Sequence, residues 1–301
     1  MDLICGSAEH YFLTKLEELR KDSGQWLGLY FSFSRLVLNS DLVGDLSSLS
    51  DKIKAGGKTS RDFAEALHKE LAGQFDGGVC VFADHDVFAL IRVRSKAEKK
   101  VLDGVFKSMA SKLPEGLSDM DSLNSQYKSY QKLADEKLLS LKRFEAYEAL
   151  GDKHKVSSIA ARRKRRDEPL VMVVEDDRFT AHYASTILNS EFDLIVCKDG
   201  EEAVQAYVEN APDIVFLDIH LPGMTGHEVL EAIYAADRDA FVVMLSVDSV
   251  RDNIVKATQM GARKFIKKPF TKERLVKTVK ESPYVRALLA SDRAGTERMF
   301  H

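Results

Sequence analysis

Three carboxylates, a hydroxyl group and an ammonium group follow short apolar runs in the second half of the chain, each where a run ends. These side chains, with the runs before them, are Glu175 and Asp176 after residues 170–174, Asp218 after 214–217, Ser246 after 241–245 and Lys268 after 264–267. Crowded carboxylates repel one another unless a cation lies between them. Hard oxygen ligands suit Mg²⁺, and a carboxylate can act as a nucleophile that forms an aspartyl-phosphate. Since a lysine and a serine can bind phosphoryl oxygens, the set predicts phosphoryl chemistry.

The elements that carry these side chains must bring them together. The four runs are typical of strands buried on both faces, as in parallel sheets. Between them, apolar residues three and four positions apart predict helices near residues 179–188, 203–208, 229–233, 254–260 and 275–279. Alternating strands and helices predict a doubly wound α/β sheet. Because the carboxyl ends of its strands converge on one crevice, we expect the polar residues to meet there.

Three sequence segments then identify a family. They are VVEDD at 173–177, DIVFLDIHLPGMTG at 213–226 and FIKKPF at 265–270, with Ser246 between the last two. In this order they resemble the receiver domain of two-component response regulators, over residues 170–281. The resemblance implies a flavodoxin-like (βα)5 fold. It also implies that Asp218 accepts a phosphoryl group from a histidine kinase or a histidine phosphotransfer protein.

The same resemblance implies a role for each remaining site residue. Glu175, Asp176, Asp218 and the backbone carbonyl of His220 would hold Mg²⁺. Ser246 and Phe265 would be the switch pair, and Lys268 would bind the phosphoryl group. Three positions depart from the commonest pattern of the family: Val247, where a small residue is usual, and His220 and Asp248, which tune dephosphorylation. The alternative, a Rossmann-like domain, lacks its Gly-rich phosphate loop after the first strand.

Composition limits the other classes of function. The net charge is −3, with 30% charged and 45% hydrophobic residues, which argues against a nucleic-acid or membrane binder as a whole. Cys5, Cys80 and Cys197 are scattered and odd in number. This pattern predicts no disulfide framework and fits a reducing cytoplasm. We expect neither a signal peptide, since residues 1–5 have no basic region, nor a membrane span, since no apolar stretch is long enough. These features predict a cytoplasmic protein.

The first half predicts a smaller α/β (α+β) domain. We expect a helix capped by Ser7, a strand at residues 26–33, a short helix within 34–58 and a helix capped by Thr59 or Ser60. A hairpin with its turn at Asp84 and His85 follows, and then a helix over residues 97–113. After residue 113, no further strand is evident from the sequence.

This order is similar to that of nucleotidyl-cyclase-like domains, including GGDEF diguanylate cyclases. Residues 84–88, Asp-His-Asp-Val-Phe, would occupy the position of the signature. Asp84 and His85 would replace its two glycines, and Val87 would replace its second acid. Ser32 and Ser34 stand where the first strand would carry metal-binding aspartates. Without those acids, a two-metal site for phosphodiester formation is missing, so the resemblance implies a degenerate, catalytically inert domain. The alternative is an ordinary α/β domain with a polar turn.

Residues 119–150 predict a long helix with a stripe of apolar residues that is interrupted at Lys137. The stripe fits either a dimer seam or a helix packed on its own domain. Residues 151–169 contain the basic run Arg162 to Arg166 and predict a linker. Such a run could bind nucleic acid, but it is more often a solvated tether, and it could pair with acids of a kinase or of the receiver itself.

These observations predict five parts: an N-terminal domain (1–116), a connecting helix (117–150), a basic linker (151–169), a receiver domain (170–283) and a tail (284–301). We predict a phosphorylation-switched signalling protein, not an enzyme, whose receiver controls dimerisation or partner binding by the N-terminal domain. A homodimer could form through 119–150 or through the 244–281 face. The alternatives are a nucleotide-binding or enzymatic N-terminal domain regulated by the receiver, and a DNA-binding regulator acting through the basic linker.

Overall fold

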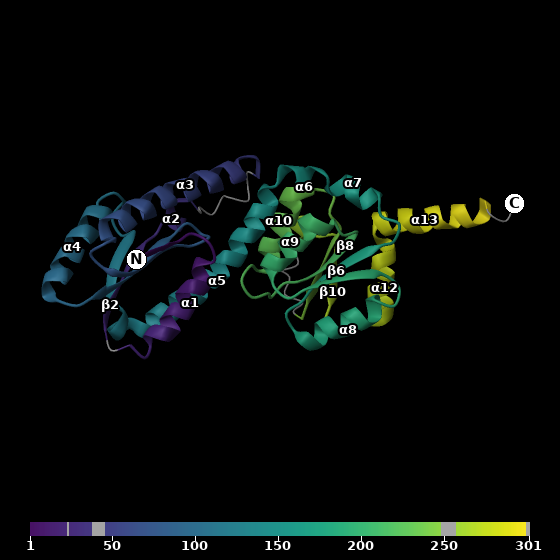
Figure 1. Ribbon diagram of the computed structural model, residues 1–301. Coiled ribbons are helices and arrows are strands. Elements are labelled where there is room, and N and C mark those ends of the chain that lie inside the picture. The colour runs from purple at the N-terminus through teal and green to yellow at the C-terminus, as the bar shows by residue number, and fades with distance from the viewer. Residues whose placement is uncertain (23, 38–45, 248–256, 299–301) are drawn as a thin grey trace. The chain divides into compact units, whose positions relative to one another are not determined.

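The computed structural model describes residues 1–22, 24–37, 46–247 and 257–298 (Figure 1). Its internal contacts divide the chain into an N-terminal unit that ends at Phe144 and a C-terminal unit that begins at Glu145. Within the described residues, no helix is both long enough and apolar enough to cross a membrane.

The N-terminal unit is built on a mixed five-stranded sheet. Its strands, in spatial order, are β1 (Asp2–Ile4), β3 (Asp76–Val81), β4 (Val87–Val93), β2 (Gln25–Phe31) and β5 (Ser118–Ser122). Only the pair β1 and β3 is parallel, and the other pairs are antiparallel. Along β2, Leu27, Leu29 and Phe31 enter one apolar cluster and Trp26 enters another. Because successive side chains of a strand point to opposite faces, both faces of this sheet are covered.

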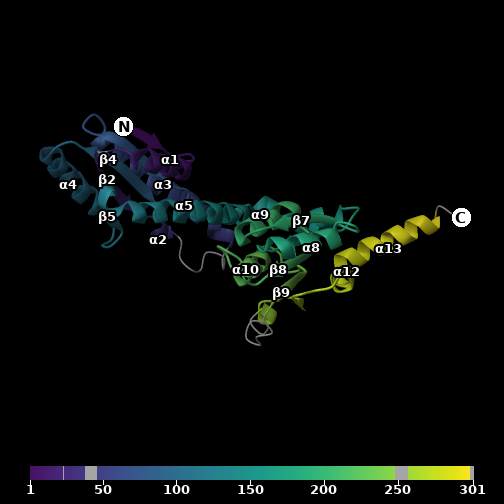
Figure 2. The ribbon, with the colours of Figure 1, turned by 90° about the horizontal axis from the view of Figure 1, so that it is seen from below.

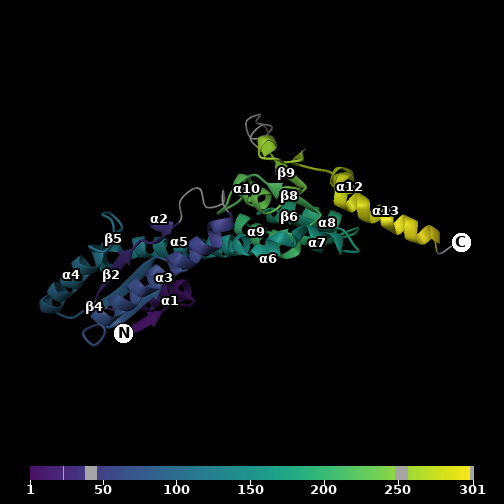
Figure 3. The same cartoon turned by 90° about the horizontal axis from the view of Figure 1, so that it is seen from above.

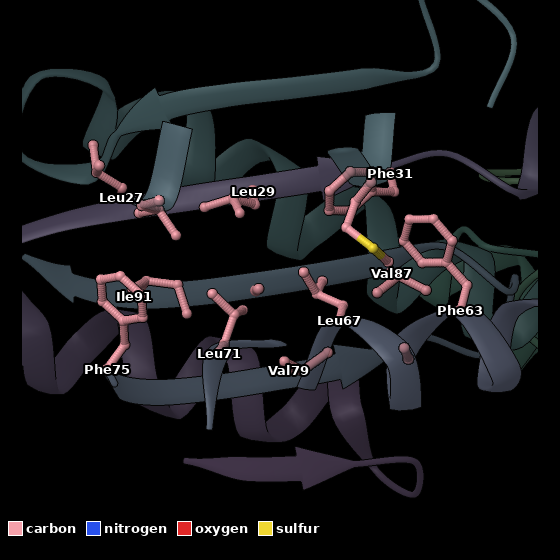
Figure 4. Close-up of a cluster of buried hydrophobic side chains, with 14 of the residues drawn as sticks. Leu27, Leu29, Phe31, Phe63, Leu67, Leu71, Phe75, Val79, Val87 and Ile91 are labelled. Carbon is pink, nitrogen blue, oxygen red and sulfur yellow. The ribbon is translucent and has the colours of Figure 1, made fainter. Parts of the chain in front are cut away.

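Helices cover these two faces and make three layers. Helices α3 (Leu46–Leu71) and α4 (Lys96–Ala110) pack on one face, where Figure 4 shows Leu67 of α3 among the buried side chains. Helices α1 (Ala8–Leu19) and α5 (Leu123–Gly151) pack on the other face through Phe12, Leu16 and Tyr130. The short helix α2 (Ser34–Val37) follows β2. The sequence therefore folds its N-terminal half as an α/β domain, as predicted.

Several local expectations for this unit were wrong. Helix α3 begins at Leu46 and continues past Thr59 and Ser60, whose hydroxyls donate to the carbonyls of Ala55 and Gly57 inside the helix instead of capping it. Ser7 precedes α1, but its side chain makes no capping hydrogen bond. Residues 118–122, expected near the start of the long helix, form β5. Backbone pairing with β2 holds these residues as a strand, although most of their side chains are polar.

The C-terminal unit is built on a parallel sheet. Its spatial order is β10 (Lys264–Lys267), β9 (Val242–Ser246), β8 (Ile214–Asp218), β6 (Leu170–Val174) and β7 (Asp193–Cys197). Every pair is parallel. In chain order this is 2-1-3-4-5, the flavodoxin-like arrangement, and the order reverses at β6. The predicted doubly wound fold of this half is therefore confirmed.

Helices lie on both faces of this sheet (Figures 1 and 2). On one face, α8 (Arg178–Leu188) and α12 (Lys272–Glu281) bury Leu188, Leu275 and Val279 against the strands. The other face carries α9 (Gly200–Asn210) and α10 (Gly226–Ala236). The predicted tail begins with a helix, α13 (Pro283–Arg298), in which Val285 is buried. Most of the helix expected near residues 254–260 lies outside the described residues.

The basic segment is folded onto the C-terminal unit as α6 (Lys153–Ser157) and α7 (Ile159–Lys164), shown from above in Figure 3. Arg162, Arg163 and Arg166 donate to backbone carbonyls of residues 208–212, at the C-terminal end of α9. Arg163, only 3% exposed, also pairs with Asp237 at 2.7 Å, and Arg166 pairs with Asp213 at 3.2 Å. Cations are favoured at a helix C-terminus, whose carbonyls carry partial negative charge. The segment therefore differs from the solvated tether that we expected, and it pairs with acids of its own C-terminal unit.

Candidate phosphoryl-acceptor site

The carboxyl ends of neighbouring parallel strands place the predicted site residues together. Strand β6 is paired with β8, so Glu175, which follows β6, comes close to Asp218, the last residue of β8. Strand β9 lies next to β8 and ends at Ser246, and β10 leads into Lys268. The point at which the strand order reverses, between β6 and β8, is where ligands bind in such sheets.

Three carboxylates form an acidic cup at this edge. One oxygen each of Glu175, Asp176 and Asp218 lies within 4.8 Å of the others. Glu175 and Asp218 are 1% and 4% exposed, whereas Asp176 is exposed to solvent. Two of the three carboxylates are therefore fixed inside the protein, and that of Asp176 lies on the solvent side of the cup.

Lys268 forms ion pairs with two of the three carboxylates of the cup. Its ammonium nitrogen lies 2.6 Å from Oε2 of Glu175 and 3.0 Å from Oδ1 of Asp218. Its backbone N–H donates to the carbonyl of Ser246 at 2.8 Å, which fixes the end of β10 beside β9. Three carboxylates and one ammonium leave two negative charges in excess when all four are ionised. A divalent cation would balance them.

The buried carboxyl group of Glu175 has an altered acidity. Burial raises the pKa of Glu175 above its ordinary value of 4.5, the nearby charge of Asp218 adds to this effect, and the ion pair with Lys268 opposes it. A raised pKa means that the ionised form is under-stabilised in the folded protein. A cation bound to the cup would relieve that penalty.

The donor set fits Mg²⁺. Oε1 of Glu175 is buried and has no hydrogen-bond partner within the described part of the chain. Carboxylate oxygens of this kind are the ligands that Mg²⁺ takes, and Mg²⁺ retains waters that a phosphoryl oxygen can replace. Glu175, Asp176 and Asp218 would therefore hold the ion. The backbone carbonyl of His220, the fourth ligand implied by the sequence, remains a prediction.

The loop after β8 fixes the backbone of Asp218. Oδ1 of Asp218 accepts the N–H of Ile219 at 2.8 Å. Thr225 caps the N-terminus of α10 and forms a reciprocal capping box with Glu228. A Cβ at Gly226 would lie 2.0 Å from the carbonyl oxygen of Asp218, so only glycine permits this close approach. The chemistry of the cup thus depends on Gly226, whose role was not evident from the sequence.

The predicted switch residues lie at the neighbouring strand ends. Ser246 is 5% exposed, and Phe265 is half-buried and opposite Met244 in the sheet register. Val247 is 57% exposed, and Asp248 lies outside the described residues. A serine at the end of β9 and an aromatic ring on β10 are therefore in place beside the cup, as the order of the strands requires.

An exposed apolar rim borders the cup. Phe179 and Tyr183 belong to the helical stripe of α8, yet they are 86% and 50% exposed. They line a hollow of about 410 Å³ together with Val247, Lys268 and Phe270, and the rings of Tyr183 and Phe270 stack at 5.9 Å. Exposed aromatic groups of this size are typical of interaction surfaces.

Comparison with known proteins places this geometry in a family. The model of the response regulator receiver domain matches residues 171–280. The chemotaxis protein CheY of Listeria monocytogenes is 36% identical over 114 residues, which are 37% of this chain and 96% of that protein. The chain belongs to the response regulator receiver family. The transcriptional regulatory protein PrrA of Mycobacterium tuberculosis is also similar, with 37% identity over 37% of this chain and 48% of its own length.

A solved structure is also similar to the receiver domain. It is the CheX–CheY–BeF3–Mg²⁺ complex from Borrelia burgdorferi, with 31% identity over 37% of this chain and 87% of that chain, and a TM-score of 0.35. Receiver domains signal through phosphorylation and act with histidine kinases or phosphotransfer proteins. Phosphorylation-dependent signalling is thus the function that the family assigns to this half of the chain.

The N-terminal unit brings together a second group of sequence-selected residues. Ser34, after β2, and Asp86, in the β3–β4 turn, are in contact, because the N–H of Ser34 donates to Oδ1 of Asp86 at 2.7 Å. His85 is buried at φ 73°, with its ring against Phe144, so it is not the surface residue of an ordinary turn. Lys137, which from the sequence was expected only as an interruption of the apolar stripe, belongs to the same group. This lysine is 4% exposed and contacts Asp84 and Asp86.

Proposed function

We propose that this chain is a phosphorylation-switched signalling protein whose receiver domain accepts a phosphoryl group on Asp218. The observation that carries the proposal is the contact of Lys268 with both Asp218 and Glu175 at the carboxyl edge of the parallel sheet. A nucleophilic carboxylate, a cation for the phosphoryl oxygens and a set of metal ligands are all present within one cup.

The chain's own residues account for the transfer. An oxygen of Asp218 attacks the phosphorus of a phosphohistidine, the N–P bond breaks as the O–P bond forms, and the ring nitrogen leaves with the bonding electrons. Lys268 attracts the transferred oxygens, exchanging part of its contact with Asp218 for the new group. Mg²⁺, held by Glu175, Asp176, Asp218 and the carbonyl of His220, would neutralise charge on the phosphoryl group.

The donor would be a histidine kinase or a histidine phosphotransfer protein. Its histidine must approach the exposed side of the cup, beside Asp176. The apolar rim formed by Phe179, Tyr183 and Val247 borders this side and would bury its exposed rings against the donor. A protein donor with an apolar surface around the histidine therefore suits the site better than a small phosphorylated metabolite.

The output follows from the charge change. Phosphorylation adds about −1.5 to −2 charges beside Ser246 and Lys268. The hydroxyl of Ser246 would move onto the phosphoryl group, Phe265 would turn inward, and the 244–281 surface would repack. We infer that this surface controls dimerisation or partner binding. The alternative seam, residues 119–150, is already engaged, because Leu123, Tyr130 and Ala134 are buried within the N-terminal unit.

We assign the N-terminal unit a binding role without catalysis. It supplies one feature that the resemblance to a degenerate GGDEF domain requires, since β5 follows the last helix of the predicted motif. The signature glycines are nevertheless Asp84 and His85, both buried. A thermal-shift screen of the full chain with GTP and cyclic dinucleotides tests this role, and we expect no stabilisation. A clear rise in melting temperature would instead identify a nucleotide-binding sensor.

Phosphorylation itself is tested by mass spectrometry of the intact chain after incubation with phosphoramidate, a small donor with a P–N bond, and Mg²⁺. Wild type should gain one phosphoryl group, and Asp218→Asn should gain none. Equal modification of the two proteins, or no modification of wild type, would refute Asp218 as the acceptor. Lys268→Met serves as a second variant, which should bind Mg²⁺ but gain the phosphoryl group far more slowly.

A further inference from the structure

A lysine of helix α5 is buried between two aspartates of the β3–β4 turn. Lys137 is 4% exposed, and Asp84 and Asp86 are 3% and 0% exposed. The ammonium nitrogen lies 2.7 Å from Oδ2 of Asp84 and also donates to Oδ2 of Asp86. These three groups form a closed ionic cluster, which we call the Lys137 cluster, inside the N-terminal unit.

The acceptor side of the cluster is fixed in place by other elements. Oδ1 of Asp86 accepts the backbone N–H groups of Phe33 and Ser34, both at 2.7 Å, and its Oδ2 accepts the hydroxyls of Tyr30 and Ser34. Oδ1 of Asp84 accepts the N–H of Asp86 at 3.2 Å. Oδ1 of each carboxylate is therefore held by backbone N–H groups, and Oδ2 of each is aimed at a common point, which the ammonium occupies.

Two aromatic faces complete the enclosure. The nitrogen of Lys137 lies 5.3 Å from the ring centroid of Tyr30 and 5.4 Å from that of Phe82. Both distances fall in the range in which a cation is attracted by the ring face. Carboxylates and ring faces thus surround the ammonium as they would a bound cation.

The charges of the cluster depend on this arrangement. Burial raises the pKa of Asp84, and the ammonium only partly offsets it. Burial acts in the same direction on Asp86, but the ammonium and the donors around it bring the pKa below its ordinary value. For Lys137, burial would lower the pKa, yet the two carboxylates raise it. The ammonium therefore remains charged, and it is the counter-ion that allows these acids to be buried.

We infer that Lys137 is the built-in cation of this acid pair. It fills the place in which Asp84 and Asp86 would otherwise bind a divalent metal ion, and it ties the β3–β4 turn to α5, the helix that leads to the receiver domain. An ammonium is a compact point charge, and paired carboxylate oxygens are also the ligands of Mg²⁺, Mn²⁺ and Ca²⁺. Two carboxylates aimed at one point cannot both ionise without some cation between them.

The Lys137 cluster limits the chemistry that is open to the N-terminal unit. Metal-assisted phosphoryl chemistry needs open ligand positions for ions and substrate. The Lys137 cluster offers none, because the oxygens directed at the common point already bind the ammonium. The N-terminal unit therefore binds no metal ion at Asp84 and Asp86. This is independent of the phosphorylation of Asp218.

Lys137→Ala in the full chain tests the inference, because it removes the ammonium and leaves Asp84 and Asp86 without their cation. Bound Mn²⁺ is counted by electron paramagnetic resonance in wild type and variant. We expect the variant to bind one more Mn²⁺ per chain than wild type, and its melting temperature to rise with Mn²⁺ more than that of wild type. Because only the difference matters, the result is independent of the metal cup in the receiver domain.

The matched control is the double variant Lys137→Ala, Asp86→Asn, which should bind no more Mn²⁺ than wild type. A folded Lys137→Ala protein with the same count as wild type would overturn the inference. If Lys137→Ala unfolds, recovery of its circular dichroism on addition of millimolar Mn²⁺ supports the built-in cation. Failure of Mn²⁺ to restore the fold would overturn it.

Discussion

At the scale of single residues, Glu175 couples metal binding to protons. Its pKa is raised above 4.5, whereas Mg²⁺ binds only the ionised carboxylate. As pH falls from 7 through the raised pKa, the affinity for Mg²⁺ should fall, by about tenfold per pH unit once Glu175 is protonated. Isothermal titration calorimetry in two buffers of different ionisation enthalpy measures both the affinity and the released proton. In Glu175→Gln the proton release near this pKa should vanish, and its persistence would show that another group titrates.

The same shift has the opposite sign for the stability of the metal-free protein. The folded state keeps the proton of Glu175 to a higher pH than the unfolded chain, whose value is near 4.5. Folding therefore becomes less favourable as pH rises from 4.5 through the raised pKa. Saturating Mg²⁺ should reverse this trend, because the ion stabilises the ionised form.

Gly226 should be as important for phosphorylation as a direct ligand. Its replacement by alanine places a Cβ 2.0 Å from the carbonyl oxygen of Asp218, so the backbone of the acceptor must move. A displacement of about 1 Å can cost on the order of 100-fold in rate. We expect Gly226→Ala to slow modification by phosphoramidate by at least about tenfold, measured by intact mass over time.

Gly104 of helix α4 provides the matched control, because a Cβ there would meet nothing within 4 Å. Gly104→Ala should leave the phosphorylation rate unchanged and stabilise the N-terminal unit by about 0.5–1 kcal/mol. If Gly226→Ala is phosphorylated at the rate of Gly104→Ala, the loop tolerates the side chain and the close approach has no role.

At the scale of elements, the basic segment is part of the C-terminal unit's structure. Replacing Arg163 by methionine would leave Asp237 without its ion pair and remove a guanidinium that lies 4.3 Å from the ring centroid of Tyr284. Breaking a buried ion pair costs about 3 kcal/mol. We expect urea unfolding of the C-terminal unit, followed by circular dichroism, to shift to lower urea by that free energy.

Two controls isolate this effect. Lys164→Met changes an exposed neighbour of the same helix and should alter stability by less than about 0.5 kcal/mol. Trp26, the only tryptophan in the chain, lies in the N-terminal unit, so its fluorescence transition should be the same in all three proteins. Equal unfolding of Arg163→Met and wild type would mean that the arginine is dispensable for the fold.

The elements also show what a single sequence can predict. The receiver site was predictable because parallel strands place the residues after them at one edge, and each strand is an apolar run. Strand β5 was not predictable, since its sequence Ser-Asp-Met-Asp-Ser has little strand preference and is ordered by pairing with β2. From the sequence, Lys137 could be recognised only as a polar residue in an apolar stripe, because its partners lie about fifty residues away along the chain. Contacts of that separation leave no local pattern.

At the scale of the whole molecule, helix α5 is the covalent route between the two units. Its first part, with Leu123, Tyr130 and Ala134, belongs to the core of the N-terminal unit, and its residues from Glu145 belong to the C-terminal unit. Since Leu123, Tyr130 and Ala134 are buried within the N-terminal unit, this part of the stripe is not available for a dimer seam. Assembly driven by phosphorylation would then use the 244–281 face of the receiver domain.

Light scattering of the full chain tests that expectation. Beryllofluoride with Mg²⁺ mimics a phosphoryl group on Asp218, so wild type should shift toward twice the monomer mass when both are added. Asp218→Asn should not change, because its neutral amide does not supply the carboxylate oxygen to which beryllium bonds. Lys264, half-buried on the expected face, pairs with Glu281, and Lys264→Glu should weaken the dimer while leaving fluoride binding intact. A mass that stays constant in wild type with bound beryllofluoride would exclude dimerisation as the output. The 244–281 surface would then have to be recognised by a separate partner.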